Sequence, residues 1–100
     1  MSSEQPGYPG YNPLQDQHLF QYVYVLRCGD GKLYTGTTKN LHDRLTRHHN
    51  GQVPATTKRR PVVLLSYFAF TDKYKALAFE KYLKSGSGRA VLNKRLIQRS

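Results

Sequence analysis

Five side chains, spread over three parts of the chain, account for the chemistry that this sequence could perform. They are two phenols, a guanidinium, an imidazole and a carboxylate, supplied by Tyr24, Tyr34, Arg44, His48 and Glu80. A phenol or an imidazole can orient or deprotonate a water molecule, and a guanidinium can offset charge that grows on a phosphate. A carboxylate can hold a divalent cation beside that phosphate. Together these groups are the parts of a metal-dependent phosphodiesterase.

Glu80 is the most informative single residue, because it interrupts the apolar face of a predicted helix. The residues Ala76, Phe79, Glu80 and Leu83 follow the i, i+3, i+4, i+7 spacing of one helical face. A carboxylate that faces a core without a cation costs several kcal/mol. The cation could be a basic side chain such as Arg44, which would make the pair structural. It could also be Mg²⁺, which binds carboxylates and phosphate oxygens while it keeps several waters.

Arg44 and His48 are four residues apart and therefore adjacent on a predicted first helix. Leu41 and Leu45 mark the buried stripe of that helix, and Arg44 and His48 lie along one border of the stripe. The arginine is suited to bind a phosphate through two parallel hydrogen bonds. The histidine could carry a proton or support a neighbouring group by a hydrogen bond.

Tyr24 and Tyr34 belong to two predicted strands that are joined by a short turn. Strand alternation places Tyr22 and Tyr24 on one face of the sheet and Val23 and Val25 on the other. Tyrosines in strands are more often packing residues, so each one alone is weak evidence. Beside a guanidinium or a metal, however, a phenol whose pKa is lowered can hold or deprotonate a water.

The elements that must position these residues follow the order β-β-α-β-α-α. We expect strands at residues 20–27 and 32–35 around a turn at residues 29–31, and then a helix from an Asn40 cap to about residue 49, closed by Gly51. The apolar run at residues 62–70 predicts the central strand of the sheet.

Two further helices complete the expected order. The first starts at a cap on Thr71 or Asp72 and runs to about Lys84, and the glycines and serines of residues 85–88 break it. A short last helix at residues 89–98 carries Asn93, which could tie that helix to the site by a hydrogen bond. A small sheet with helices packed against it fits this order.

Charge is distributed unevenly along the chain. Residues 1–26 contain two acids and no Lys or Arg, whereas residues 27–100 contain all sixteen Lys and Arg and four acids, a net charge of +12. Such a surplus attracts polyanions, of which DNA and RNA are the commonest. Four of the basic residues are expected to bind phosphates that flank the reacting one: Lys39, Lys58, Arg59 and Arg60.

The remaining composition limits the class of protein. Residues 1–18 are rich in Pro, Gly, Gln and Tyr, so we interpret them as a disordered tail in front of one domain at residues 19–100. No run of ~20 apolar residues predicts a membrane span, and no secretory signal is apparent. The lone Cys28 fits a reducing compartment, so we expect a cytoplasmic protein, with association with the nucleoid as one option. No Cys/His pattern or Gly-rich loop predicts a zinc site or a small-molecule cofactor.

The spacing of the five residues resembles the GIY-YIG nuclease family, most closely its small stand-alone single-domain members. Residues 22–24 (Tyr-Val-Tyr) stand where the family has Gly-Ile-Tyr, and residues 34–36 (Tyr-Thr-Gly) where it has Tyr-Ile-Gly. Arg44 corresponds to the catalytic arginine of the family, His48 to a position that is His or Tyr, and Glu80 to the metal-binding glutamate.

The resemblance covers about residues 20–98 and implies an α+β fold with a three-stranded antiparallel sheet flanked by helices. It also implies cleavage of a DNA phosphodiester that depends on Mg²⁺ or Mn²⁺. The first triplet lacks the glycine and isoleucine of the family but keeps its tyrosine. Thr37 stands where some relatives carry a lysine, so a lysine-assisted step is not expected.

These observations predict a small divalent-metal-dependent DNA endonuclease that acts on single-stranded or structured DNA. Tyr24 or Tyr34 would orient or deprotonate the attacking water, and Arg44 would steady the charged phosphate. A metal held by Glu80 would stabilise the leaving 3′-oxygen. Because many family members carry a separate DNA-binding domain, a protein partner could supply targeting here.

Two alternatives stay open at this point. One is a nuclease directed at RNA. The other is a non-catalytic nucleic-acid-binding module that kept the fold and the charge. Loss of Glu80 or Arg44 would mark such a module, and both residues are present.

Overall fold

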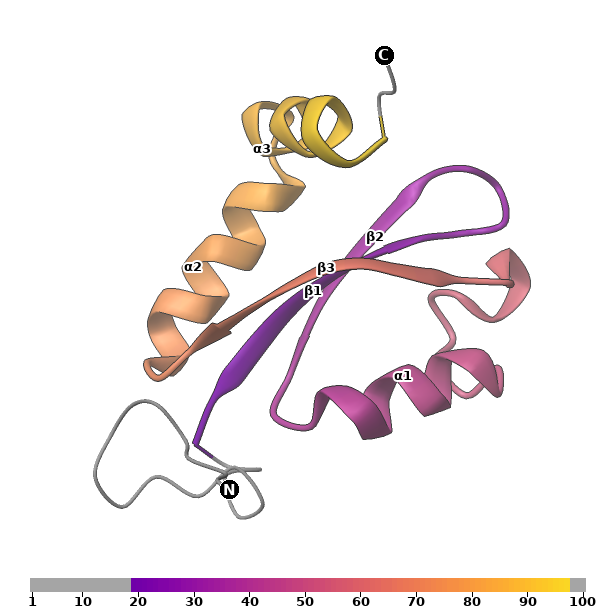
Figure 1. The fold of residues 1–100 in the computed structure, drawn as a ribbon, viewed down its shortest axis with the longest axis horizontal. Coiled ribbons are helices and arrows are strands. Elements are labelled where there is room, and N and C mark those ends of the chain that lie inside the picture. Colours follow the sequence, from indigo (N-terminus) through magenta and orange to yellow (C-terminus); the bar gives the residue numbers. More distant parts are fainter. Residues whose placement is uncertain (1–18, 98–100) are drawn as a thin grey trace, which may run out of the picture.

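The computed structural model of the protein describes residues 19–97, so the tail predicted at residues 1–18 lies outside the described part. Three strands form one antiparallel sheet in the order β2-β1-β3, and helices pack against it (Figure 1). The strands are β1 (Gln21–Arg27), β2 (Leu33–Thr38) and β3 (Val63–Phe70), and the α-helices are α1 (Leu41–His49), α2 (Lys73–Lys84) and α3 (Gly86–Leu92). A 3₁₀ turn at Thr57–Arg59 precedes β3, and a π-helical turn at Asn93–Ile97 follows α3. The predicted α+β fold and order of elements are confirmed.

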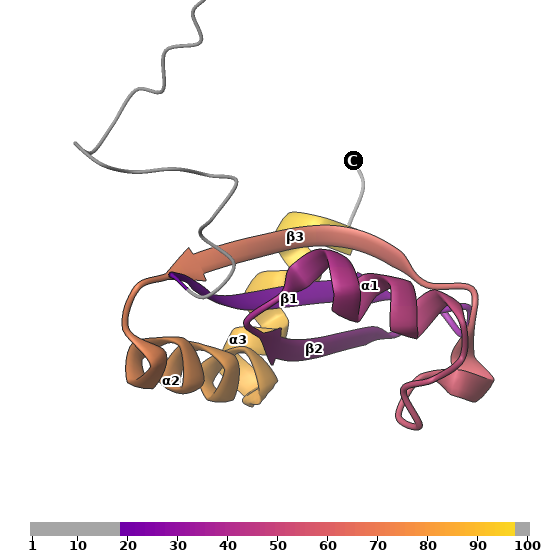
Figure 2. The ribbon, with the colours of Figure 1, turned by 90° about the horizontal axis from the view of Figure 1, so that it is seen from below.

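β1, and not the apolar β3, is the central strand, so the prediction made from residues 62–70 was wrong (Figure 2). β1 pairs with both neighbours, and its residues Val23–Leu26 have no exposed surface. In β3 the exposed fraction reaches 45% at Val63 and 54% at Tyr67. The reason is that this edge strand is built from side chains as apolar as those of the centre, so hydrophobicity alone does not distinguish the two.

Helices cover opposite faces of the sheet (Figure 1). Alternation along β1 sends Val23 and Val25 to one face and Tyr24 and Leu26 to the other, as predicted. The two valines pack beneath α2 and α3 against Ala76, Leu83 and Leu92. The other face, on the side of α1, is filled by Tyr24 and Leu26 together with Cys28, Val62 and the partly buried Tyr34, Leu41 and Leu45. The face of α1 is therefore the one that carries the phenols.

The ends of α1 and α2 follow the capping signals in the sequence. The Asn40 side chain accepts a hydrogen bond from the Asp43 amide at 2.9 Å, and the Asp72 side chain caps α2. Gly51, with a φ of +77°, follows the end of α1. None of the helices within residues 19–97 is long and apolar enough to cross a membrane.

The segment that follows α2 differs from the prediction. α2 ends at Lys84 as predicted, but α3 already begins at Gly86 and not at Arg89. Ser85 alone separates the two helices, because it ends α2 and also caps α3 by accepting a hydrogen bond from the Gly88 amide at 3.2 Å. The role of Gly88 is spatial: a Cβ at this position would overlap the Tyr82 carbonyl oxygen and lie 2.6 Å from Leu83 Cα. The glycine therefore lets α3 fold back closely on the end of α2.

We expect Gly88→Ala to destabilise the protein by about 2 kcal/mol or more, because backbone atoms of α2 cannot move aside as a flexible side chain would. Gly86→Ala is the matched control, since a Cβ there meets no atom within 4 Å. That variant should be neutral or up to about 1 kcal/mol more stable. Urea unfolding of both proteins measures the difference, and equal midpoints would contradict the proposed close approach.

Candidate active site

The site on the face of α1 is organised around the side chain of Tyr24. In the sheet Tyr24 lies opposite Gly36 of β2, and its ring extends across the backbone of that glycine. A Cβ at position 36 would lie only 2.5 Å from the Tyr24 hydroxyl oxygen and 2.7 Å from Cζ. The glycine in the second tyrosine-containing triplet therefore provides the space that the first tyrosine occupies. Tyr24 has no exposed surface.

His48 brings α1 into contact with this phenol. The sequence had suggested that this histidine lies on the border of the buried stripe of the helix. In the structure it is instead fully buried. Its Nε2 lies 2.8 Å from the Tyr24 hydroxyl oxygen, and its Nδ1 lies 2.7 Å from Oγ1 of Thr56. The imidazole also packs edge-on against the rings of Tyr24 and Tyr34, with centroid distances of 5.6 and 5.3 Å. Both ring nitrogens are thus engaged inside the fold.

Burial sets the protonation of this pair. It raises the pKa of Tyr24 to about 12, and Tyr34 adds to the shift, while the Arg44 guanidinium opposes it by its charge and by a hydrogen bond. Burial also lowers the pKa of His48 to about 4, and the positive charges of Arg44 and His49 act in the same direction. Near neutral pH the phenol is therefore protonated and the imidazole is neutral.

Glu80 lies on α2, which packs on the opposite face of the sheet from Tyr24. Burial is the main reason that the pKa of Tyr24 is raised, and the negative charge of Glu80 makes the smallest contribution to that rise. The Glu80 side chain is 17% exposed and pairs with Lys84 at 2.9 Å, so the cation beside it in this structure is Lys84 and not Arg44. Lys84 is half-exposed and four residues away on the same helix, a type of pair that contributes little stability. The lysine can therefore leave the carboxylate at low cost.

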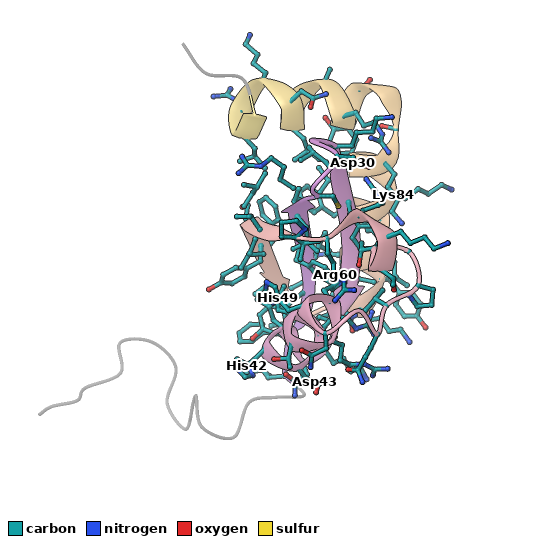
Figure 3. The ribbon with its side chains drawn as sticks, turned by 90° about the vertical axis from the view of Figure 1, so that its right-hand side faces the viewer. Asp30, His42, Asp43, His49, Arg60 and Lys84 are labelled. Atoms are coloured by element: carbon teal, nitrogen blue, oxygen red, sulfur yellow. The ribbon has the colours of Figure 1, made fainter. Side chains whose placement is uncertain are left out.

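The remaining predicted residues are placed less centrally. Arg59 pairs with Asp30 of the β1–β2 turn at 2.9 Å. Arg60 donates hydrogen bonds to the carbonyl oxygens of Thr57 and His49, and Figure 3 shows it beside His49. These two arginines tie the segment before β3 to its surroundings, whereas the neighbouring Lys58 is exposed.

Lys39 and Asn93 lie in separate hollows. Lys39 lines an open groove of about 400 Å³ between α1 and the sheet, with Tyr22 and Tyr67 among its walls. The rings of these tyrosines are 6.0 Å apart in an edge-on arrangement. Asn93 is exposed and lines a smaller cavity beside the β1–β2 turn, together with Arg89. The structure thus brings Lys39 near α1, while the cavity that Asn93 lines has neither Tyr24 nor Tyr34 among its walls.

A metal ion would find few protein ligands here. Within residues 19–97 no group of three or more His, Cys, Asp and Glu side chains is placed to hold one. Glu80 alone fits Mg²⁺ or Mn²⁺, because such ions keep several waters and take further oxygens from a substrate phosphate. The donor chemistry therefore suits an ion that binds together with its substrate.

Thr56 is the residue of this site that sequence reasoning missed. It lies in the loop between Pro54 and Pro61, which the sequence marked only as basic. The side chain has no exposed surface, and its hydroxyl meets His48. A threonine beside a second threonine in a polar loop carries no signal of burial, so only the structure identifies it.

The low pKa of His48 predicts a specific pH dependence of stability. An unfolded histidine with an ordinary pKa of 6.5 binds a proton before the folded one does, so acid favours unfolding. The free energy of unfolding should fall by on the order of 2 kcal/mol between about pH 7 and pH 4.5. Urea titrations at several pH values measure this fall.

His48→Gln removes the titrating ring and should flatten this part of the profile. His42→Gln changes an exposed histidine on the same helix and should keep the wild-type slope. A wild-type profile as flat as that of His48→Gln would show that His48 is not held neutral by the fold.

Comparison with known proteins agrees with the geometry. The sequence model of the GIY-YIG catalytic domain matches residues 20–95. A UPF0213 protein of Pediococcus acidilactici is 45% identical over 74 residues, which cover 71% of this chain and 76% of the relative. A UPF0213 protein of Staphylococcus saprophyticus is 42% identical over 73 residues, which cover 72% of this chain and 85% of the relative.

A solved structure is similar as well. The UPF0213 protein BH0048 from Bacillus halodurans, whose solution NMR structure is known, is 33% identical in sequence to this chain. The structural match covers 75% of this chain and 83% of the BH0048 chain, with a TM-score of 0.50. The matched region contains all five residues from which the sequence argument started. The chain therefore belongs to the GIY-YIG family.

Proposed function

We propose that the protein is a divalent-metal-dependent endonuclease that hydrolyses DNA phosphodiester bonds. Membership in the GIY-YIG family implies a nuclease with a nucleic-acid substrate. The observation that supports the proposal is the packing of Tyr24, Tyr34 and His48 against one another on the face of the sheet that α1 covers. Two phenols and an imidazole that meet around a buried hydrogen bond are more than packing of the sheet requires.

Each residue has a role that suits its surroundings. Tyr34 is partly exposed, which supports it as the phenol that orients or deprotonates the attacking water. Tyr24 is buried on His48, which supports a role in orienting the groups of the site from behind. Arg44 is partly buried on α1 and would neutralise charge on the phosphate. Mg²⁺ or Mn²⁺ held by Glu80 would supply charge stabilisation at the leaving 3′-oxygen.

The surface supports a nucleic acid as the partner. The sixteen Lys and Arg lie after residue 26 against four acids. The groove between α1 and the sheet combines Lys39 with the rings of Tyr22 and Tyr67, and such a combination suits a phosphate followed by an unpaired base. These features favour DNA that is single-stranded or has unpaired nucleotides, encountered in the cytoplasm. RNA and a non-catalytic binding role are the alternatives, which the same assays separate.

Glu80→Ala should lower cleavage by on the order of 10²-fold or more, because the cation near the leaving oxygen would lose its protein ligand. The fold should survive, since a methyl group suits this face of α2. Cleavage of labelled single-stranded, duplex and flap DNA, and of RNA, is measured with Mg²⁺, Mn²⁺ or EDTA.

Lys84→Ala is the matched control for that experiment, because it removes the other half of the ion pair. If Glu80 serves a metal, the Lys84 variant should cleave at about the wild-type rate. If the pair is merely structural, both variants should be affected alike. Wild-type cleavage by a folded Glu80→Ala protein would rule out the metal role, and no metal-dependent cleavage of any substrate by the wild type would rule out the enzyme.

Binding should depend strongly on salt, because the charge after residue 26 favours phosphate neutralisation. If about six phosphates are contacted, affinity should fall on the order of 10³-fold between 50 and 200 mM salt. Fluorescence anisotropy in EDTA measures binding without cleavage. Lys39→Ala should reduce the salt slope by about one unit, whereas Lys94→Ala, an exposed lysine beyond α3, should not. A nearly flat salt dependence would instead point to a small-molecule or protein ligand.

A further inference from the structure

We propose that Thr56 is a positioning residue whose buried hydroxyl holds His48 in the Nδ1-protonated form, so that Nε2 is free to accept a hydrogen bond from the Tyr24 hydroxyl. The inference deepens the proposed function, on which its catalytic part rests. The protonation state itself is a property of the folded protein. It can be tested whether or not the protein cleaves DNA.

The position of Thr56 is fixed by its backbone. Its amide donates to the Val53 carbonyl oxygen at 3.0 Å, and its own carbonyl oxygen accepts from the Arg59 amide at 2.9 Å. The next residue, Thr57, places its hydroxyl 2.9 Å from the carbonyl oxygens of both Gly51 and Val53. The loop is thus held on both sides of Thr56. Its hydroxyl is the group left to meet His48, at 2.7 Å from Nδ1.

The protons at Tyr24 decide between the two neutral forms of the imidazole. Within residues 19–97, the partner placed at hydrogen-bonding distance of the Tyr24 hydroxyl is Nε2 of His48, at 2.8 Å. If Nε2 carried a proton, it would donate to the phenol oxygen and could not accept from it. The phenol proton would then lack this acceptor, within a side chain that has no exposed surface. A buried donor without a partner costs about 1–3 kcal/mol.

The other form satisfies every proton. With the proton on Nδ1, His48 donates to Thr56, and its bare Nε2 accepts from the Tyr24 hydroxyl at 2.8 Å. The Thr56 hydroxyl then points its hydrogen toward the Val53 carbonyl oxygen, which lies at the long distance of 3.5 Å. A threonine can accept and donate at once, as this chain of bonds requires.

This arrangement fixes the phenol hydroxyl behind the site. Because burial raises the pKa of Tyr24 to about 12 and lowers the pKa of His48 to about 4, the proton stays on the phenol oxygen and forms the hydrogen bond to Nε2. Without the Thr56 hydroxyl, the Nδ1–H group would lose its acceptor, and this form of the ring would no longer be favoured.

Long-range ¹H–¹⁵N correlation NMR of the imidazoles, recorded on the folded full chain near pH 7, tests the inference directly. In the wild type, His48 should show a protonated Nδ1 and an unprotonated Nε2. Thr56→Val keeps the shape but lacks the hydroxyl, and it should shift the ring toward the Nε2-protonated form. Thr56→Ser should restore the wild-type pattern.

Thr57→Val is the matched control, because it loosens the same loop without touching His48. It should leave the Nδ1-protonated pattern in place. A wild-type ring protonated on Nε2 would overturn the inference with no variant needed. So would a Thr56→Val protein that keeps the Nδ1 proton.

Kinetics provide the second readout. Loss of the outer hydrogen-bond partner of a metal-ligating histidine typically costs about 10- to 100-fold. We expect a similar factor for His48, whose orientation fixes the Tyr24 hydroxyl. Thr56→Val should lower kcat by that factor with KM nearly unchanged and should shift the pH–rate profile, whereas Thr56→Ser should recover both. Equal kcat and equal pH profiles for Thr56→Val and wild type would overturn the catalytic part. If the wild type cleaves nothing, the proposed function fails, while the NMR pattern still decides the role of Thr56 on its own.

Discussion

One contact in the core, between an aromatic ring and a residue without a side chain, determines how the rest of the site is arranged. Tyr24 lies over Gly36, and this contact brings the phenol of the central strand across β2 and beneath α1. The hydroxyl then needs a partner inside the core, and His48 provides it. Because the histidine is equally buried, its second nitrogen needs a partner too, which is Thr56. Each buried polar atom thus requires the next, and α1 and the loop after it are placed accordingly.

The site has two parts with different physical character. The inner part is uncharged near neutral pH, because burial keeps Tyr24 protonated and His48 neutral. The outer part is charged and meets solvent, with Arg44 partly buried and Glu80 in an exchangeable pair with Lys84. A phosphate and a cation can enter the outer part without disturbing the core. The low dielectric of the inner part in turn strengthens the hydrogen bonds that hold the phenol.

Much of this arrangement follows from local patterns in the sequence. Alternation along β1, the Asn40 and Asp72 caps and the apolar stripe around Glu80 all depend on neighbours in the chain, and the structure confirms them. Features that depend on long-range packing did not follow. The edge position of β3 results from how the strands pair, and the burial of Thr56 results from how a loop folds onto α1. The pairing of Glu80 with Lys84 is local and could have been predicted from their i, i+4 spacing, but Arg44 was considered as the cation instead.

The burial of Tyr24 and His48 also bears on how this family should be interpreted through evolution. These two side chains fill the space between α1 and the sheet, so selection for a stable fold retains them whether or not a descendant still cleaves anything. Arg44 and Glu80 are more exposed, and a lineage that gave up catalysis could lose them at little structural cost. In a set of divergent sequences, the residues at the positions of Tyr24 and His48 would therefore indicate common descent. The residues at the positions of Arg44 and Glu80 would indicate whether the catalytic chemistry has been kept.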